Sequence, residues 1–311
     1  MWNVMQIVLP VFLIIGLGWG IRRAGLVDDT FFLQINKFVF YVCLPLLLIY
    51  KIGTADFSVS FNIRLVIATG SAIGCCFFIS YLYGAKRGFP PPILGAFCQG
   101  SFRGNLAYIG LAIVYNAYGD IGLTSAGILL GFLVPVLNFF AILALTLPQQ
   151  QHRINYQNIA WQMAVNPLIL SSLIGIAWSY FHLPMPEILD RSLAIATGMT
   201  LPLALLSIGG SFSAANFRGD FGKAGLASTI KLIVLPLLTA VFLLLFGVTG
   251  MDFAIGLLMA GAPAAVATYI RACQMGGDGR LAGTIVVMST AASLLSYTLI
   301  LLCLHLASIG P

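Results

Sequence analysis

Charged residues are scarce in this chain, because Asp, Glu, Lys and Arg together make up only 8% of its 311 residues, whereas 60% are hydrophobic. A soluble globular domain carries about 25% charged residues, so this composition excludes an ordinary water-soluble protein. The chain also lacks a polar stretch long enough for a soluble domain, and it is too long for a single anchoring helix. It is therefore predicted to be a multi-pass integral membrane protein.

Patterns for catalysis and metal binding are also missing. The three histidines lie far apart, and all six cysteines fall inside apolar runs, so we expect neither a metal site nor disulfides. No G-x-x-x-x-G-K-[ST] motif for nucleotide binding occurs, and no serine has a plausible histidine base. We therefore expect that the protein is not an enzyme and that it binds no cofactor. The net charge of +6 is scattered between apolar runs, which favours membrane topology over binding of nucleic acid.

Ten apolar runs are each long enough to cross the hydrocarbon core, which needs about 20 residues. These predicted spans 1 to 10 cover residues 4–21, 31–50, 63–83, 92–117, 121–147, 160–181, 188–210, 223–246, 252–275 and 281–306. They are apolar on every side, unlike the alternating strands of a β-barrel. The sequence thus predicts an all-α integral membrane protein with ten transmembrane helices. Gly16 and Gly20 in span 1 form a candidate face for close helix packing, either within the chain or at a contact between subunits.

Lys and Arg are distributed unequally between the two sets of connections. One set holds eight cations: Arg22, Arg23, Lys86, Arg87, Arg153, Arg218, Lys223 and Arg280. The opposite set holds three: Lys51, Arg64 and Arg191. Because cytoplasmic loops are enriched in Lys and Arg, the first set is predicted to be cytoplasmic. Both termini then lie on the non-cytoplasmic side of the inner (plasma) membrane.

The two halves of the chain show a weak internal repeat. Three pairs recur at offsets of 157 or 158 residues: Pro10 with Pro167, Pro45 with Pro202, and Gly119-Asp120 with Gly277-Asp278. Each half holds five spans, an odd number, so the second half must enter the membrane inverted, as is typical of secondary transporters. We therefore predict two inverted repeats of five helices, at residues 1–147 and 159–311, joined by a short cytoplasmic linker at 148–158.

Spans 4 and 9 carry helix-breaking residues near their centres. Span 4 has Gly100 and Gly104 among polar side chains, and span 9 has Gly261 and Pro263 among small ones. A break at this depth survives only against protein or a water-filled cavity. A simple proline kink is the alternative. The corresponding positions of the two spans in the two halves favour a substrate site, as in inverted-repeat transporters.

Three cations lie deep inside predicted spans, whereas Lys37 is close to the start of span 2 and is expected to extend to the interface. No Asp or Glu falls in the central part of any span. Arg103 is at the break of span 4, Lys231 is one-third of the way into span 8, and Arg271 is about two turns beyond the break of span 9. Deep ionisable residues cost about 2.5–3.5 kcal/mol on insertion scales and are usually functional. The N-termini of the second half-helices add positive dipole ends. Together these features predict a site for an anion.

The candidate substrate-binding residues are the polar and helix-breaking positions of spans 4 and 9, namely Gln99, Ser101, Arg103, Asn105, Pro263, Thr268 and Tyr269. Lys231 and Arg271 are candidates for coupling or charge balance. Each cation also has a structural alternative. Arg103 could cap the carbonyls that end the first half of span 4, Lys231 could extend to the cytoplasmic interface, and Arg271 could be a deep positive-inside residue. Asn105 is expected to cap the second half-helix as well as to bind a carboxylate.

The Phe97–Asn105 stretch, followed by Tyr108–Leu111, resembles the span-4 signature of the auxin efflux carrier family of bacterial permeases. Ala262-Pro263, Gly276–Asp278 and Met288–Thr290 are similar to the family's ninth and tenth spans. The resemblance covers essentially the whole chain. It implies a scaffold of spans 1, 2, 6 and 7, often dimeric, and a transport unit of spans 3–5 and 8–10 that moves like an elevator. Substrate would bind where spans 4 and 9 cross.

The resemblance also assigns individual residues. The family's polar residue at the crossing matches Asn105, and its span-9 proline matches Pro263. Plant relatives place a polar residue beside that proline, where this chain has Ala264 and Ala265. This departure weakens auxin as the expected substrate and shifts recognition onto span 4, Thr268 and Tyr269. The long cytoplasmic loop of many plant relatives is absent.

These features favour a secondary active transporter for a small organic anion, such as a mono- or dicarboxylate, that works by alternating access. A sodium-coupled symporter is the alternative within transporters, although a Na⁺ site would normally need a buried carboxylate. An anion channel would suit the same charges, but broken and crossing helices favour alternating access. The expected partners are the anion, the lipid bilayer and, as the resemblance implies, a second copy of the chain bound through the scaffold helices.

Overall fold

The computed structural model describes residues 2–149, 161, 164–212, 220–307 and 309. The regular structure of this part of the chain is helical. Its α-helices are α1 (Trp2–Arg23), α2 (Asp29–Phe38), α3 (Leu44–Gly53), α4 (Phe57–Ser60), α5 (Ile63–Lys86), α6 (Pro91–Phe102), α7 (Leu111–Thr146), α9 (Pro167–Tyr180), α10 (Glu187–Gly198), α11 (Thr200–Gly210), α12 (Phe221–Thr229), α13 (Leu235–Leu245), α14 (Gly250–Ala260), α15 (Val266–Gln274) and α16 (Gly279–Leu306). Three π-helical turns, η1 (Val39–Cys43), η2 (Leu106–Gly110) and η5 (Ile230–Val234), and the 3₁₀ turn η3 (Leu147–Gln149) complete them.

Among the described residues, seven helical stretches are long and apolar enough to cross a membrane: Val4–Arg23, Thr30–Gly53, Ile63–Lys86, Leu106–Gln149, Glu187–Gly210, Phe221–Leu245 and Gly279–Leu306. The helices α9 and α14 are apolar but shorter. Outward-facing side chains remain apolar, since Leu13, Ile195 and Leu245 are 63%, 81% and 73% exposed. Such exposure would be unfavourable in water, and it confirms a multi-pass membrane protein. The predicted linker and the start of the predicted span 160–181 lie mostly outside the described residues.

The longest helical stretch, α7, is two helices joined by a sharp turn. Gly119 has φ +61° and ψ −150°, which interrupts the helix between the predicted spans 92–117 and 121–147. A Cβ atom at Gly122 would lie 3.2 Å from Cγ1 of Val114, eight residues earlier. Eight residues along a straight helix would separate these positions by about 12 Å. The chain therefore reverses direction at Gly119, where glycine permits the positive φ.

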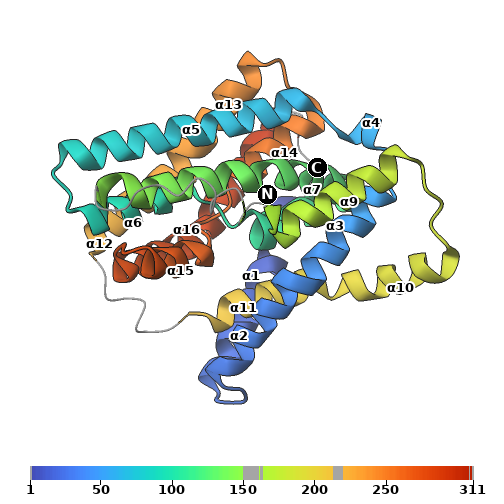
Figure 1. Cartoon of the computed structure of the whole chain (residues 1–311), viewed down its shortest axis with the longest axis horizontal. Coiled ribbons are helices and arrows are strands. Elements are labelled where there is room, and N and C mark those ends of the chain that lie inside the picture. The colour runs from blue at the N-terminus through green and yellow to red at the C-terminus, as the bar shows by residue number, and fades with distance from the viewer. Residues whose placement is uncertain (1, 150–160, 162–163, 213–219, 308, 310–311) are drawn as a thin grey trace.

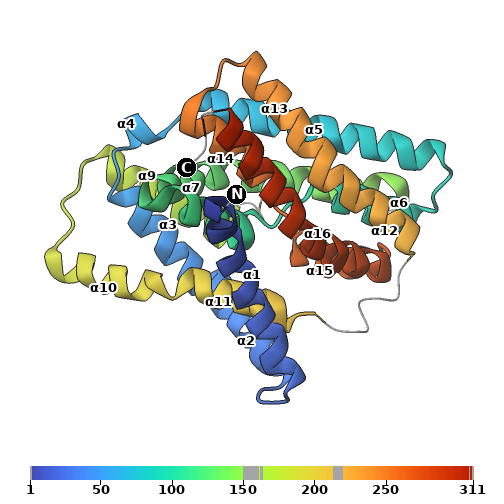
Figure 2. The same ribbon diagram turned by 180° about the vertical axis from the view of Figure 1, so that it is seen from behind.

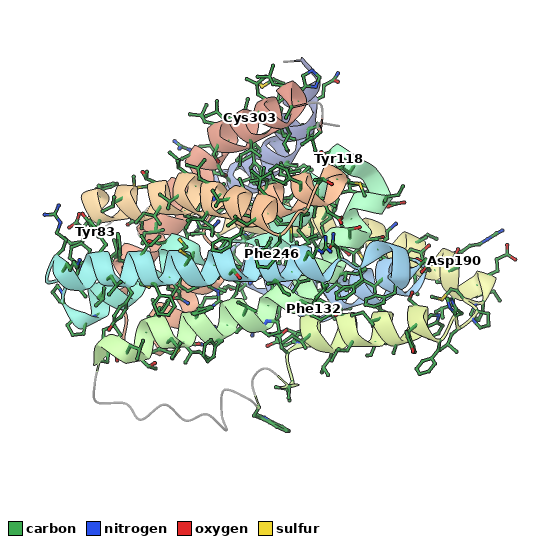
Figure 3. All side chains as sticks on the ribbon, turned by 90° about the horizontal axis from the view of Figure 1, so that it is seen from above. Tyr83, Tyr118, Phe132, Asp190, Phe246 and Cys303 are labelled. Atoms are coloured by element: carbon green, nitrogen blue, oxygen red, sulfur yellow. The ribbon has the colours of Figure 1, made fainter. Side chains whose placement is uncertain are left out.

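The helices form two groups (Figures 1 and 2). Helices α1–α3 and α9–α11 make one group, and α5–α7 and α12–α16 make the other. In the first group α1 packs along α11, and α3 packs along α9. In the second, α5 packs against α13, and α12 packs against α16. Figure 3 shows Tyr83, near the end of α5, and Asp190, in α10, at opposite ends of the molecule.

Glycines bring the backbones of α1 and α11 into direct contact. A Cβ atom at Gly18 would lie 2.2 Å from the carbonyl oxygen of Leu206, and one at Gly209 would lie 1.8 Å from that of Ile15. Neither position tolerates a side chain without separation of the helices. At Gly16 and Gly20, by contrast, a Cβ atom would meet nothing within 4 Å. The expectation that these two glycines form the packing face is wrong within this chain, because the face belongs to Gly18.

Candidate functional site

The candidate site is organised around two interrupted helices that are hydrogen-bonded to each other. Helix α6 ends at Phe102 and helical structure resumes at Leu106, whereas α14 ends at Ala260 and α15 begins at Val266. The amide of Asn105 donates to the carbonyl of Pro263 at 2.7 Å, and the amide of Ala265 donates to the carbonyl of Arg103 at 3.0 Å. Gly104 and Ala264 thus face each other as an isolated antiparallel bridge.

This pairing explains how two helix breaks are tolerated deep in the protein. Backbone groups cannot be left without partners at membrane depth. Each break supplies partners to the other, and the amide of Ala264 donates to Ser289 Oγ on α16 at 3.0 Å. The two helix interruptions lie where the glycines and the proline of predicted spans 4 and 9 indicate a break. They are a built junction between the two halves of the chain and not simple proline kinks.

Substitution of Ala265 by proline tests this junction. Ala265 has φ −75° and ψ 143°, which a proline ring accepts, so the change removes the N–H without forcing a new backbone conformation. The buried carbonyl of Arg103 then loses its partner, and we expect about 1–3 kcal/mol of destabilisation. Thermal unfolding in detergent measures the effect. Ala265→Ser, which keeps the N–H, should unfold like the wild type; equal midpoints for all three proteins would contradict the role of the pairing.

Lys231 lies at the centre of this junction. Its side chain is 0% exposed, and Nζ donates to the carbonyl of Ala260, the last residue of α14, at 2.7 Å. A Cβ atom on Gly104 would lie 3.3 Å from the same Nζ. The ammonium therefore stands where α6 and α14 end, and helix C-termini attract cations. Lys231 does not extend to the cytoplasmic interface, so that alternative is wrong.

Two arginines from different halves of the chain meet at one amide. Arg103 Nη2 donates to Asn138 Oδ1 on α7 at 3.2 Å, and Arg271 Nη2 on α15 donates to the same oxygen at 3.0 Å. Each arginine keeps a buried Nη1 that has no hydrogen-bond partner among the described residues. Arg103 is turned toward α7, so the alternative in which its side chain caps α6 is not observed. The interpretation of Arg271 as only a positive-inside residue leaves this convergence unexplained.

Two further polar side chains near the arginines have no described partner. Gln99 lies one turn before Arg103 on α6, is fully buried, and has neither Nε2 nor Oε1 in a hydrogen bond. Thr268 lies one turn before Arg271 on α15, is also fully buried, and has an unpaired Oγ1. The helices α6 and α15 are in contact. Buried polar groups are normally hydrogen-bonded, so such a concentration of unpaired groups calls for an explanation.

The remaining predicted residues are placed differently. Ser101 Oγ donates to the carbonyl of Phe97 within α6 at 2.8 Å, which satisfies it locally. Tyr269 is 37% exposed, and the structure does not bring it to the junction. Asn105 is buried beside Pro263, but its side chain makes no capping hydrogen bond to η2, so the expected cap is wrong. Pro263 contributes its carbonyl to the backbone pairing.

Seven of the nine carboxylates have partners elsewhere among the described residues, and one of the seven is Asp28, which caps the N-terminus of α2. Asp120 pairs with Lys51 at 2.6 Å, Glu187 pairs with Arg191 at 2.6 Å, and Asp220 pairs with Lys223. Asp190 accepts from the phenol of Tyr50, Asp252 accepts from Asn62, and Asp278 caps the N-terminus of α16. Within this part of the chain, none of these groups contacts Arg103, Lys231 or Arg271. The junction is therefore positively charged, as the sequence predicts.

A cavity of about 410 Å³ lies between the two helix groups. Its walls come from α1, α3, α7, α10 and α11, and include Pro10, Val11, Ile14, Leu47, Tyr50, Lys51, Ala112, Tyr115, Asn116, Asp120, Leu123, Thr197, Leu201, Pro202 and Leu205. The Lys51–Asp120 ion pair, which joins α3 to the start of the second arm of α7, is part of its lining. The cavity thus combines an apolar wall with polar groups.

Sequence reasoning did not select Asn138 or the lining of this cavity. Asn138 stands alone in the apolar run Leu133–Leu145, and an unpaired amide in such a run is costly. That isolation was the available signal. The cavity carries no comparable signal, because its residues come from five helices and most are ordinary membrane-helix side chains.

Comparison with known proteins places these features in a family. Residues 3–159 and 149–301 match the family model described as "Membrane transport protein". An uncharacterized transporter of Methanothermobacter thermautotrophicus is 24% identical over 94% of this chain and 96% of its own length, and one of Methanocaldococcus jannaschii is 22% identical over the same shares. Auxin efflux carrier component 6 of Arabidopsis thaliana is 28% identical over 43% of this chain and 24% of its own length. The chain therefore belongs to the membrane transport protein family that includes the auxin efflux carriers.

Proposed function

We propose that this membrane transporter is a secondary active carrier of a small organic anion, which binds beside the junction of the two interrupted helices. One observation carries the proposal: the buried guanidinium of Arg103 and the partly buried one of Arg271 converge there, each with a buried and unpaired Nη1, and without a carboxylate among the described residues. Buried charges are normally paired. A substrate that supplies the missing negative charge accounts for the arrangement.

We further propose ten transmembrane helices in two inverted repeats of five. Helices α6 and η2–α7 up to Gly119 make one interrupted span, and α14 and α15 make its counterpart. Exchange of the two halves relates α1 to α9 and α3 to α11, so the packed pairs α1–α11 and α3–α9 interchange. These four, with α2 and α10, form the scaffold, and the second helix group forms the transport unit.

Contacts between connections support the proposed division of the connections into two sides, and the bias of Lys and Arg is the basis for placing both termini outside the cytoplasm. The amide of Asp278 donates to the carbonyl of Pro92 at 2.9 Å, which brings together two connections that are both assigned to the cytoplasm. Lys51 and Asp120, on two connections assigned to the opposite side, form an ion pair. The phenol of Tyr118 donates to the carbonyl of Ile309, so the end of the chain lies on that second side as well.

The 410 Å³ cavity is the proposed path from the non-cytoplasmic side. It lies between the scaffold and the transport unit, near the Lys51–Asp120 pair. A second contact joins the two units, since Tyr108 of η2 donates to Asn36 Oδ1 of α2 at 2.7 Å. An elevator-like movement of the transport unit would break the Lys51–Asp120 ion pair and the Tyr108–Asn36 hydrogen bond. The same movement would open a path to the cytoplasmic side. The energy would come from the membrane potential, worth about 2.3 kcal/mol per charge at 100 mV, or from a proton carried on the substrate.

Counterflow in proteoliposomes tests the function. Vesicles loaded with unlabelled malonate, acetate or auxin are diluted into the labelled compound in sodium-free buffer. We expect saturable accumulation of at least one of these anions. Uptake that appears only with Na⁺ would favour a sodium symporter instead, and flux that rises linearly without saturation would favour a channel. Absence of flux for all three anions under every ion condition would contradict the proposal.

A further inference from the structure

The hydrogen bonds of Asn138 are unusual because two cations share one neutral acceptor. Arg103 and Arg271 each place Nη2 within 3.2 Å of the same Oδ1, so the two guanidinium groups are close neighbours. Like charges this close repel each other, and the repulsion is strong where water is excluded. A single amide oxygen offers only a partial negative charge in return. The positive charge of the two guanidinium groups is therefore only partly balanced in the structure.

The unpaired atoms around the pair indicate what would complete it. Both Nη1 groups, both polar atoms of Gln99 and the hydroxyl of Thr268 are buried without partners among the described residues. Guanidinium groups bind carboxylates through two parallel N–H···O bonds, which a point acceptor cannot reproduce. An anion with two oxygens would satisfy both arginines at once. Arg271 is only partly buried as a residue, although its unpaired Nη1 is buried.

We infer that Arg103 and Arg271 together bind one carboxylate group of the substrate, one arginine from each half of the chain. In the structure Asn138 Oδ1 takes the position of a carboxylate oxygen and keeps the two guanidinium groups in place. This inference rests on the proposed function and locates its substrate site. It moves recognition from the Asn105–Pro263 backbone contact to the side of the junction formed by α6, α7 and α15.

Substitution of Asn138 by aspartate tests the inference. The change is isosteric and places a permanent carboxylate between the arginines, so it should occupy the site. We expect affinity for malonate and acetate, measured by titration calorimetry of the purified protein, to fall at least tenfold, while the unfolding midpoint stays the same or rises. Asn166→Asp is the matched control, because Asn166 Oδ1 caps α9 by accepting from the amides of Leu168 and Ile169 rather than from an arginine, and aspartate caps equally well. It should bind both probes like the wild type.

A second variant covers the case in which Asn138→Asp does not fold. Arg271→Gln removes one cation at a partly exposed position, and we expect at least a tenfold loss of affinity for the probe that the wild type binds. Wild-type affinity in a folded Asn138→Asp or Arg271→Gln protein would overturn the inference even if counterflow persists. If the wild type neither binds nor transports any carboxylate, the proposed function fails and this inference fails with it.

Discussion

Replacement of Arg103 by alanine is expected to reduce anion counterflow by about tenfold or more without unfolding the protein. A hydrogen bond to a charged group contributes about 1.5–3 kcal/mol, so its loss should weaken binding by about tenfold to 150-fold. The fold should persist because the change removes a buried charge that has no carboxylate partner, and Asn138 keeps its bond to Arg271. Counterflow at a substrate concentration below saturation measures the effect.

Two comparisons make this result specific. Arg87, whose guanidinium lies over the ring of Tyr83 outside the junction, is the matched control, and Arg87→Ala should transport normally. Arg103→Lys keeps the charge but not the planar fork, so it should transport at an intermediate rate. Wild-type counterflow in Arg103→Ala would show that the buried guanidinium does not serve the substrate.

The largest expected effect on stability is that of Gly209→Ala. The new Cβ atom would lie 1.8 Å from the carbonyl oxygen of Ile15 and 2.8 Å from the amide nitrogen of Trp19. Overpacking typically costs about 1–3 kcal/mol, and backbone atoms cannot move aside as side chains do. We therefore expect a cost at or above about 3 kcal/mol, seen in detergent as a fall of about 5 °C or more in the unfolding midpoint.

Gly16→Ala is the matched control for this prediction. Gly16 lies on α1, close to the same interface, but a Cβ atom there meets nothing within 4 Å. Alanine is favoured over glycine inside a helix by about 1 kcal/mol, so this variant should be at least as stable as the wild type. An unchanged midpoint for Gly209→Ala, or a fall of equal size for Gly16→Ala, would contradict the backbone contact between α1 and α11.

The sequence predicts the helices and their interruptions well for a physical reason. Membrane crossing demands long apolar runs, and a break at depth needs glycine, proline or polar residues, so both leave marks in the sequence. The breaks near Gly104 and Pro263 and the reversal at Gly119 fall where these residues indicate. The sequence also predicts that no carboxylate lies near the deep cations, because all nine Asp and Glu residues lie near the ends of apolar runs or between them.

The partners of the deep residues could not be predicted in the same way. Which carbonyl Lys231 caps, and that Arg103 and Arg271 share Asn138, depend on the rotation of each helix about its axis and on contacts between distant parts of the chain. Composition does not specify these rotations. The same limit applies to Gly16, Gly18 and Gly20, which all lie on α1. The sequence does not show which of them packs against another helix, because that depends on the position of α11.

Solid-state NMR provides the most direct test of an anion site at the junction. The protein is labelled with ¹⁵N at arginine side chains, reconstituted in lipid, and saturated with malonate that carries ¹³C in its carboxylates. We predict dipolar coupling between a carboxylate carbon and guanidinium nitrogens at about 4 Å, as charge-assisted hydrogen bonds require, and weaker coupling in Arg103→Ala, where only Arg271 remains. Bound malonate that shows no coupling to any arginine, or the same coupling in Arg103→Ala, would contradict the account.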